Sequence, residues 1–427
     1  MIYLLTSIIY LVKGHFRITL TNFLFFMLFS TSISAYLVGR QPSADIVSFL
    51  LSLYTVVLLS MAFLSFRPYE RTTNVLLNVN KSRLSKCESL LTILVVGVIF
   101  FQSYIFINLF SQLMVGLVTV DEHKNGGGAT AFFDSVVPHV VMTYINTFSP
   151  LGFICLSLHF YYLIQGNISK TIRFLFLSFA IVLSSFLALS RSAVTEYILI
   201  YTALFCLFSP VIKHSIKKKI LKVSLFFFLA IGVVFYLISA SRFSAYYTKN
   251  SENTAIIDET NNPVAFSLFD YFSQWEENGL IIMKMYKPEY KFWGTYNSCG
   301  LLVFIESKMT NPNIYADINE RMEKYVGRQW MMFHGLIARL IYDFGYIGTI
   351  IFMIIYSILI KKFRPLKGNL SFNSVLALPL LVAPISLFWA GNMLVYVNVD
   401  MAIIYSIFFW KYIKNNKKCL IKQKEIV

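Results

Sequence analysis

The stretch FLALSRSAVTEYILIY, residues 186–201, places the charged side chains of Arg191 and Glu196 in an apolar segment. An arginine guanidinium keeps its charge in every protein environment, and its planar fork of N–H donors fits two oxygens of a phosphate. Ser190 and Ser192 add hydroxyl donors on either side. We interpret these three residues as a candidate anion site. The alternative is an arginine that only anchors the segment at a membrane surface.

Glu196 is a candidate for catalysis because a carboxylate in an apolar, membrane-length segment is expensive and is usually retained for function. It would act as a proton acceptor. The competing interpretation is an ion-pair partner for an arginine, either Arg191 or one on another helix, and the sequence leaves both open.

Two later stretches carry further candidates. Arg242 stands in SASRF, and HGLIARLIYDFGYIG contains His334, Arg339 and Asp343. Arg339 and Asp343 are four residues apart, so on a helix they share one face and can pair. A guanidinium has donors to spare, so Arg339 could also reach a phosphate. His334 would accept a proton or donate a hydrogen bond to an anion, or serve only a structural role.

Acids and aromatic rings alternate in the polar segment before His334. Aromatic faces pack on the C–H surfaces of sugars while carboxylates accept hydroxyls, although any small folded patch has a similar composition. The residues concerned are Asp270, Tyr271, Trp275, Glu276, Glu277 and Trp293. The sequence contains no phosphate-binding glycine loop, no metal-binding Cys/His pattern and no paired-acid motif for a nucleotide sugar. We therefore expect no metal, no cofactor and no cytoplasmic nucleotide donor.

The composition indicates an integral membrane protein. Of 427 residues, 57% are hydrophobic and 14% are charged, against about 25% charged in soluble domains. The net charge of +16 does not point to nucleic acid, because the lysines cluster between apolar runs and no nucleic-acid-binding motif is present.

Ten apolar windows are long enough to cross a bilayer as helices, which needs about 20 residues. They cover residues 18–38, 44–66, 88–110, 139–164, 171–190, 193–210, 221–240, 334–360, 371–390 and 393–412. Residues 1–12 are too short for a comfortable span. We expect a short interfacial or re-entrant helix there, or a marginal eleventh span.

The basic residues set the expected orientation. Most of the 37 lysines and arginines fall in alternate connections, which are therefore cytoplasmic together with both chain ends. Residues 241–333 lie outside and carry 11 of the 21 acidic residues. Helix-like apolar spacing in PVAFSLFDYFSQWEENGLIIMKMY predicts a mostly helical subdomain there. The expected organisation is membrane helices in 1–240, this loop in 241–333, and membrane helices with a cytoplasmic tail in 334–427.

Three of the quoted stretches, LALSRSAVTEYIL, SASRF and HGLIARLIYDFGYIG, are similar to a known pattern. The chain resembles the O-antigen polymerase family (Wzy-type) of bacterial envelope polysaccharide synthesis, and more distantly the O-antigen ligases. The topology of the resemblance covers the whole chain, and the motifs cover residues 187–348.

The resemblance implies an all-α polytopic protein of the bacterial inner membrane with the C-type membrane glycosyltransferase fold. It implies metal-independent transfer of a growing chain from undecaprenyl pyrophosphate onto the next lipid-linked oligosaccharide repeat unit, with a chain-length regulator protein as a partner. Arg191 and Arg242 would hold the pyrophosphate, assisted by Arg339. His334 matches a histidine of the ligase branch, where asparagine often stands in place of Gly335.

Two other functions remain open at this point. An O-antigen ligase would transfer the finished chain to the lipid A core, and sequence physics barely separates it from a polymerase. A flippase for lipid-linked oligosaccharides, or another transporter, belongs to a different class. Such proteins normally show internal repeats and lack a large outer segment, whereas this chain shows no repeat and has one large segment.

Overall fold

A computed structural model gives the fold of the chain. It describes residues 2–13, 17–40, 45–114, 137–186, 192–220, 222, 263–293, 320, 324, 333–390 and 397–414. The chain forms two compact units, and each is described on its own. The first comprises residues 1–70, 206–362 and 384–395, and the second comprises residues 71–205, 363–383 and 396–427.

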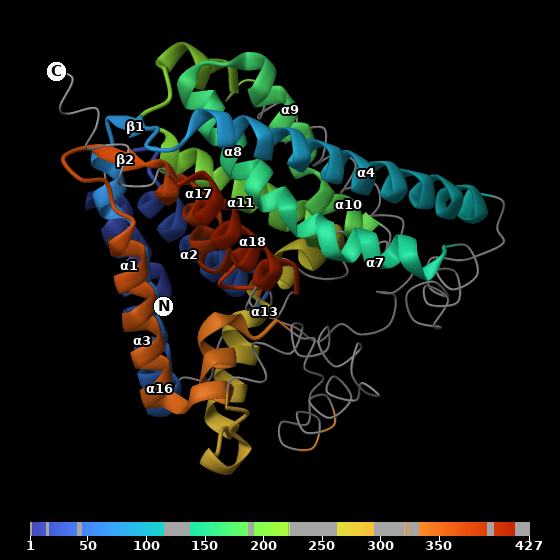
Figure 1. Ribbon diagram of the computed structural model, residues 1–427. Helices are drawn as coiled ribbons and strands as arrows, with labels where there is room; N and C mark the ends of the chain where they lie inside the picture. Colours follow the sequence, from blue (N-terminus) through green and yellow to red (C-terminus); the bar gives the residue numbers. More distant parts are fainter. Residues whose placement is uncertain are drawn as a thin grey trace. The chain divides into compact units, whose positions relative to one another are not determined.

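The first unit is built from helices that precede and follow the predicted outer segment in the sequence. One helix of that segment packs with them. Figure 1 shows α3 and the second part of α16 side by side. Tyr54 donates a hydrogen bond to the Tyr346 carbonyl and Tyr69 donates one to the Ile360 carbonyl, so the two helices run together over their length. The elements are α1 (Ile2–Lys13), α2 (Leu20–Leu37), α3 (Ile46–Ser65), η1 (Arg67–Arg71), α13 (Pro263–Met285), η3 (Pro288–Tyr290) and α16 (Gly335–Lys362).

The N-terminal segment is the helix α1, which packs against α2 and α3. Its 12 residues span about 18 Å at 1.5 Å per residue. That length is too short to cross a hydrocarbon core of about 30 Å. Tyr3 and Leu11 are buried, and Tyr10 stacks on Phe25 of α2 with ring centroids 4.2 Å apart. The helix is therefore held mainly by its apolar contacts.

The helix predicted for residues 334–360 is bent. Gly345 has φ 72° and ψ 176°, which interrupts α16 after its first ten residues. This backbone conformation is essentially restricted to glycine. The part of α16 before the bend packs with α13, where Tyr342 donates a hydrogen bond to the Ile282 carbonyl.

The second unit consists mainly of helices, and two of its predicted spans are interrupted. Pro150 lies in the 3₁₀ turn η2, which separates α7 from α8 within the window 139–164. The window 171–190 is divided at Phe179, which ends α9, and α10 follows at once. The elements are α4 (Lys81–Met114), α7 (His139–Phe148), η2 (Ser149–Leu151), α8 (Gly152–Gln165), α9 (Ile168–Ser178), α10 (Ala180–Phe186), most of α11 (Ser192–Phe208) and α17 (Phe372–Ser386), and α18 (Val397–Ile413).

Two short strands also occur in this unit, although the sequence predicted only helices. β1 (Asn74–Leu76) pairs in parallel with β2 (Asn369–Ser371). Close to them, the Asn80 N–H donates to the Ile413 carbonyl at 3.0 Å. The contacts join the connections after the second and eighth predicted spans and the start of the tail, three segments that the sequence predicts to lie on one side of the membrane.

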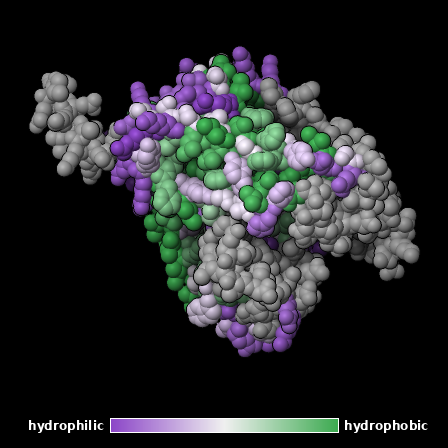
Figure 2. All heavy atoms as spheres, turned by 45° about the vertical axis from the view of Figure 1, so that its right-hand side comes forward, coloured by the Kyte–Doolittle hydropathy of each residue, from purple (hydrophilic) through white to green (hydrophobic). Residues whose placement is uncertain are grey.

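Five helices in the described ranges are long and apolar enough to cross a membrane. They are Leu20–Leu37, Ile46–Arg71, Lys81–Leu109, His139–Gln165 and Gly335–Lys362. The predicted span 221–240 lies almost wholly outside the described residues. Large apolar side chains are exposed along these helices, among them Ile347, Ile351, Ile354 and Ile358 of α16. Figure 2 shows hydrophobic side chains, in green, gathered on one face of the molecule. Water solvates such a surface poorly, so the chain is a helical protein suited to a membrane.

We expect Gly345→Ala to destabilise the protein by about 1–3 kcal/mol, because alanine is strained at this φ and ψ. Its Cβ would also lie 3.1 Å from the Tyr286 hydroxyl. Thermal unfolding of the purified chain in detergent measures the change. Ile347→Ala, on an exposed side chain two residues away, is the matched control. Equal unfolding temperatures for the two variants would contradict this account of the bend.

Candidate functional site

The helix α13, which lies in the predicted outer segment, docks on the first unit through charged contacts. Arg40, just beyond α2, pairs with both Asp270 and Glu277 of α13, the latter at 2.6 Å. At the other end of α13, Lys284 pairs with Asp45 at 2.6 Å. Burial alone would lower the pKa of Arg40, but its two carboxylate partners outweigh that effect and raise its pKa. These pairs fix α13 at both ends.

Between these pairs, Glu276 points into the interior. Its side chain is 4% exposed, and its Oε1 accepts a hydrogen bond from the Ser32 hydroxyl at 2.6 Å. Burial raises the pKa of Glu276 to about 7, against the opposing effect of the Ser32 hydrogen bond. A carboxyl group with this pKa takes up and releases a proton near neutral pH, which is the property that a general base or acid needs.

His334 is brought to Glu276 by two glycines. Gly335 starts α16 with φ 75°, and the Leu336 N–H donates to the Phe388 carbonyl at 2.7 Å. On α13, a Cβ added at Gly279 would lie 2.7 Å from the His334 carbonyl oxygen. Only a residue without a side chain lets the two helices approach this closely. His334 itself is 1% exposed.

Glu276 and His334 line one cavity in the first unit, together with Tyr3, Thr55 and Trp275. Its volume is about 10 Å³. That is about what a single water molecule needs. The cavity takes one water or one hydroxyl group, and a sugar ring does not fit inside it.

Trp275 also lines the cavity. Its ring packs edge-on against Tyr3 and Phe388, at centroid distances of 5.2 and 5.3 Å. Its indole Nε1 is buried and has no hydrogen-bond partner in the described part of the chain. A buried donor without a partner is unfavourable, so Nε1 is a place where a bound water would stabilise the protein.

The structure places the predicted site residues as follows. His334 lines the cavity, and Arg339 lies half-buried five residues later, before the bend in α16. Asp343 lies on the same part of α16, and its pairing with Arg339 stays a prediction. Glu196 lies on α11, in the second unit. Ser190, Arg191 and Arg242 lie outside the described residues, as does the side chain of Ser192.

The acids and aromatic rings of the outer segment separate into different roles. Asp270 and Glu277 pair with Arg40, so their contacts hold α13 in place. Trp275 and Glu276 line the cavity. Trp293 is 77% exposed, and Lys291 lies over its ring at 3.8 Å. The sequence pointed to Glu196 and His334 as proton acceptors, and the geometry adds Glu276 to them.

Three contributors to the site were missed, namely Tyr3, Ser32 and Thr55. Ser32 lies 244 residues before Glu276 in the chain, and no local pattern marks any of the three as a site residue. The one available signal is the short apolar segment 1–12, for which the sequence favoured an interfacial or re-entrant helix but left a marginal span open.

Comparisons of the chain with protein-family models, curated proteins and solved structures find no match. The site is therefore described from its own geometry.

We expect Glu276→Gln to remove a pH dependence of stability. The native carboxyl holds its proton up to about pH 7, whereas the unfolded group ionises near its ordinary value of 4.5. Wild-type stability relative to the glutamine variant therefore falls as the pH rises from 4.5 to 7 and is constant above that range. The full difference is on the order of 3 kcal/mol.

Unfolding temperatures at pH 5 and pH 8 for wild type, Glu276→Gln and Glu277→Gln measure this effect. Glu277 is the neighbouring carboxylate, is 34% exposed and pairs with Arg40. A wild-type pH response that is kept in Glu276→Gln but lost in Glu277→Gln would contradict the assignment.

Proposed function

We propose that the chain is a membrane glycosyltransferase of the O-antigen polymerase type. It would transfer a growing polysaccharide from undecaprenyl pyrophosphate to the next lipid-linked repeat unit, on the outer side of the bacterial inner membrane. The observation that carries the proposal is the cavity shared by Glu276 and His334. It lies where the helix of the outer segment meets the start of the next membrane-length helix.

In the proposed reaction, a hydroxyl of the incoming repeat unit attacks the anomeric carbon of the donor chain. A new glycosidic C–O bond forms, and the bond from that carbon to the pyrophosphate breaks with its electron pair on the departing oxygen. The hydroxyl proton goes to Glu276 or His334. The cavity has room for a group the size of a hydroxyl beside Glu276 and His334.

The leaving group needs positive charge where its negative charge develops. Arg191 and Arg242 are the proposed ligands of the pyrophosphate, and Arg339 would assist from its place one and a half helical turns after His334. Guanidinium groups keep their charge at a membrane interface, so they can stabilise the departing pyrophosphate without a metal ion.

Contacts in the second unit support the proposed sidedness. β1 and β2 lie in the connections 67–86 and 361–370, and their basic residues assign both connections to the cytoplasm. Paired strands must lie on one side of the membrane, which requires an even number of crossings between them. The six spans predicted between residues 88 and 360 satisfy that condition.

A gel of surface polysaccharide from a strain without this chain tests the function. Loss of the polymerase should leave a single repeat unit on the lipid core, and the chain should restore the long ladder. A deletion that removes even the single repeat would instead favour the O-antigen ligase. An unchanged ladder, or lipid-linked repeats trapped on the inner face, would contradict the proposal.

In that strain, we expect Arg191→Ala to abolish long-chain polymer while the protein level in the membrane is kept. Arg191→Lys should also be defective, because a point charge does not reproduce the two-oxygen grip of a guanidinium. Immunoblotting of membranes gives the protein level. Wild-type ladders from Arg191→Ala would remove this residue from the pyrophosphate site.

We also expect Glu276→Gln to lower polymer formation at least about 100-fold, which is the usual size of a general-base contribution. Glu277→Gln should retain polymer, since Arg40 keeps its second partner Asp270. His334→Ala should lower polymer as well. Equal ladders from the Glu276 and Glu277 variants would limit Glu276 to a structural role.

A further inference from the structure

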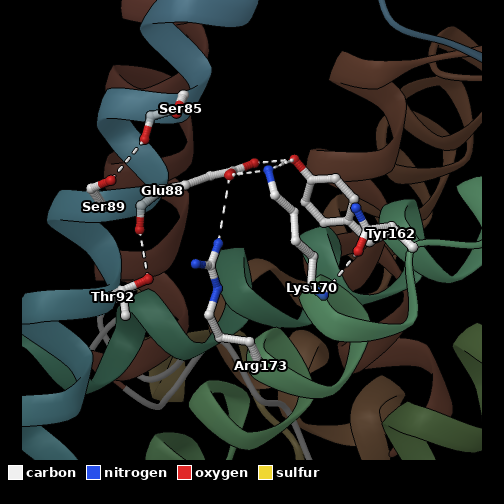
Figure 3. Close-up of polar contacts among 8 residues, drawn as sticks. Ser85, Glu88, Ser89, Thr92, Tyr162, Lys170 and Arg173 are labelled. Atoms are coloured by element: carbon white, nitrogen blue, oxygen red, sulfur yellow. Dashed lines mark hydrogen bonds and ion pairs between the residues drawn. The ribbon is translucent and has the colours of Figure 1, made fainter.

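A second polar cluster lies in the second unit, whereas the residues that line the cavity belong to the first. Glu88 of α4 is 3% exposed and receives three partners from α8 and α9 (Figure 3). Its Oε2 pairs with Lys170 at 2.7 Å and Arg173 at 3.6 Å, while its Oε1 accepts the Tyr162 hydroxyl. Two cations therefore face one carboxylate, and the cluster keeps an excess positive charge.

Both cations stay partly open to the surroundings. The side chain of Lys170 is 35% exposed and that of Arg173 is 41% exposed. Aromatic rings hold them in place, with Lys170 Nζ 4.6 Å from the Tyr162 ring centroid and the Arg173 guanidinium 4.7 Å from that of Phe174. At 3.6 Å the Arg173–Glu88 contact is an ion pair but not a hydrogen bond, so it does not engage a guanidinium N–H donor.

An apolar row lies on the same helix as the two cations. Ile168, Ile172 and Phe176 of α9 follow one another at four-residue spacing, and they are 71%, 62% and 56% exposed. Residues at this spacing share one helix face. Glu88 also lies near the start of α4, a membrane-length helix that begins at Lys81. Cations at the end of an apolar helix face lie at the depth of lipid headgroups.

We propose that Lys170 and Arg173 bind the phosphate of an anionic phospholipid, whose acyl chains lie along the apolar row of α9. The charge argument selects this partner, because two partly exposed cations lie on the same helix as an exposed apolar row. Glu88 positions the two cations and limits the strength of the site, since its carboxylate competes with the phosphate for them. This inference does not depend on the proposed transferase activity.

Native mass spectrometry of the full chain in detergent, titrated with phosphatidylglycerol or phosphatidylcholine, tests the site. Wild type should retain phosphatidylglycerol preferentially. Arg173→Ala should lower that preference about tenfold, the effect of losing one charge-assisted contact. Lys361→Ala, at the end of α16, is the control and should leave binding unchanged.

Glu88→Gln gives the sharpest outcome, because it should raise phosphatidylglycerol binding several-fold by removing the competing anion. A cluster that serves only to hold α4, α8 and α9 together predicts no change in lipid preference for either variant, and that result would overturn the proposal. Free glycerol phosphate at the same concentration should not displace the lipid. If it does, the site recognises phosphate alone and the lipid assignment is wrong.

Discussion

The close approach of α13 to the first turn of α16 is the contact on which the candidate site depends. Two glycines permit it, since a side chain on Gly279 would meet the His334 carbonyl and Gly335 adopts a positive φ beside Trp275. Without this approach, Glu276 and His334 would not line one cavity. The charged pairs of Arg40 and Lys284 hold α13 in the register that this contact needs.

The apolar setting of these helices explains why so many charges are paired. A charged side chain removed from water is unfavourable unless a partner replaces the lost solvation. Glu88 meets this requirement with two cations and a tyrosine, and Arg40 meets it with two carboxylates. Glu276 meets it differently, because its burial favours the protonated form. A group poised in this way is a better candidate for proton transfer than one held in an ion pair.

The helices were largely predictable because apolar periodicity and length are local signals. The predicted helix in the outer segment is present as α13, and the membrane-length windows from residue 18 to residue 110 are α2, α3 and α4. The interruptions within the predicted helices were harder to predict from the sequence. Pro150 is a visible breaker in the sequence, but nothing in the sequence distinguishes Gly345, where α16 bends, from Gly348 in the same helix. The strands β1 and β2 were missed because three-residue strands carry almost no pattern.

The site was predicted only in part. His334 was singled out from its position at the start of a helix, and Glu276 was one of several acids. Choosing between those acids requires knowing that Asp270 and Glu277 share Arg40 while Glu276 meets Ser32, a contact across 244 residues of sequence. The anion site at Ser190, Arg191, Ser192 and Arg242 rests on residue type and predicted orientation, and it remains a prediction.

The most direct measurement is transfer by the purified chain in liposomes that contain synthetic repeat units on undecaprenyl pyrophosphate. The account predicts longer lipid-linked oligosaccharides and one released undecaprenyl pyrophosphate for each repeat added, with both products lost in the Glu276→Gln protein. Extension that proceeds equally in that variant would contradict the proposed base. The absence of any extension by the wild-type chain, with folded protein and both substrates present, would contradict the proposed function itself.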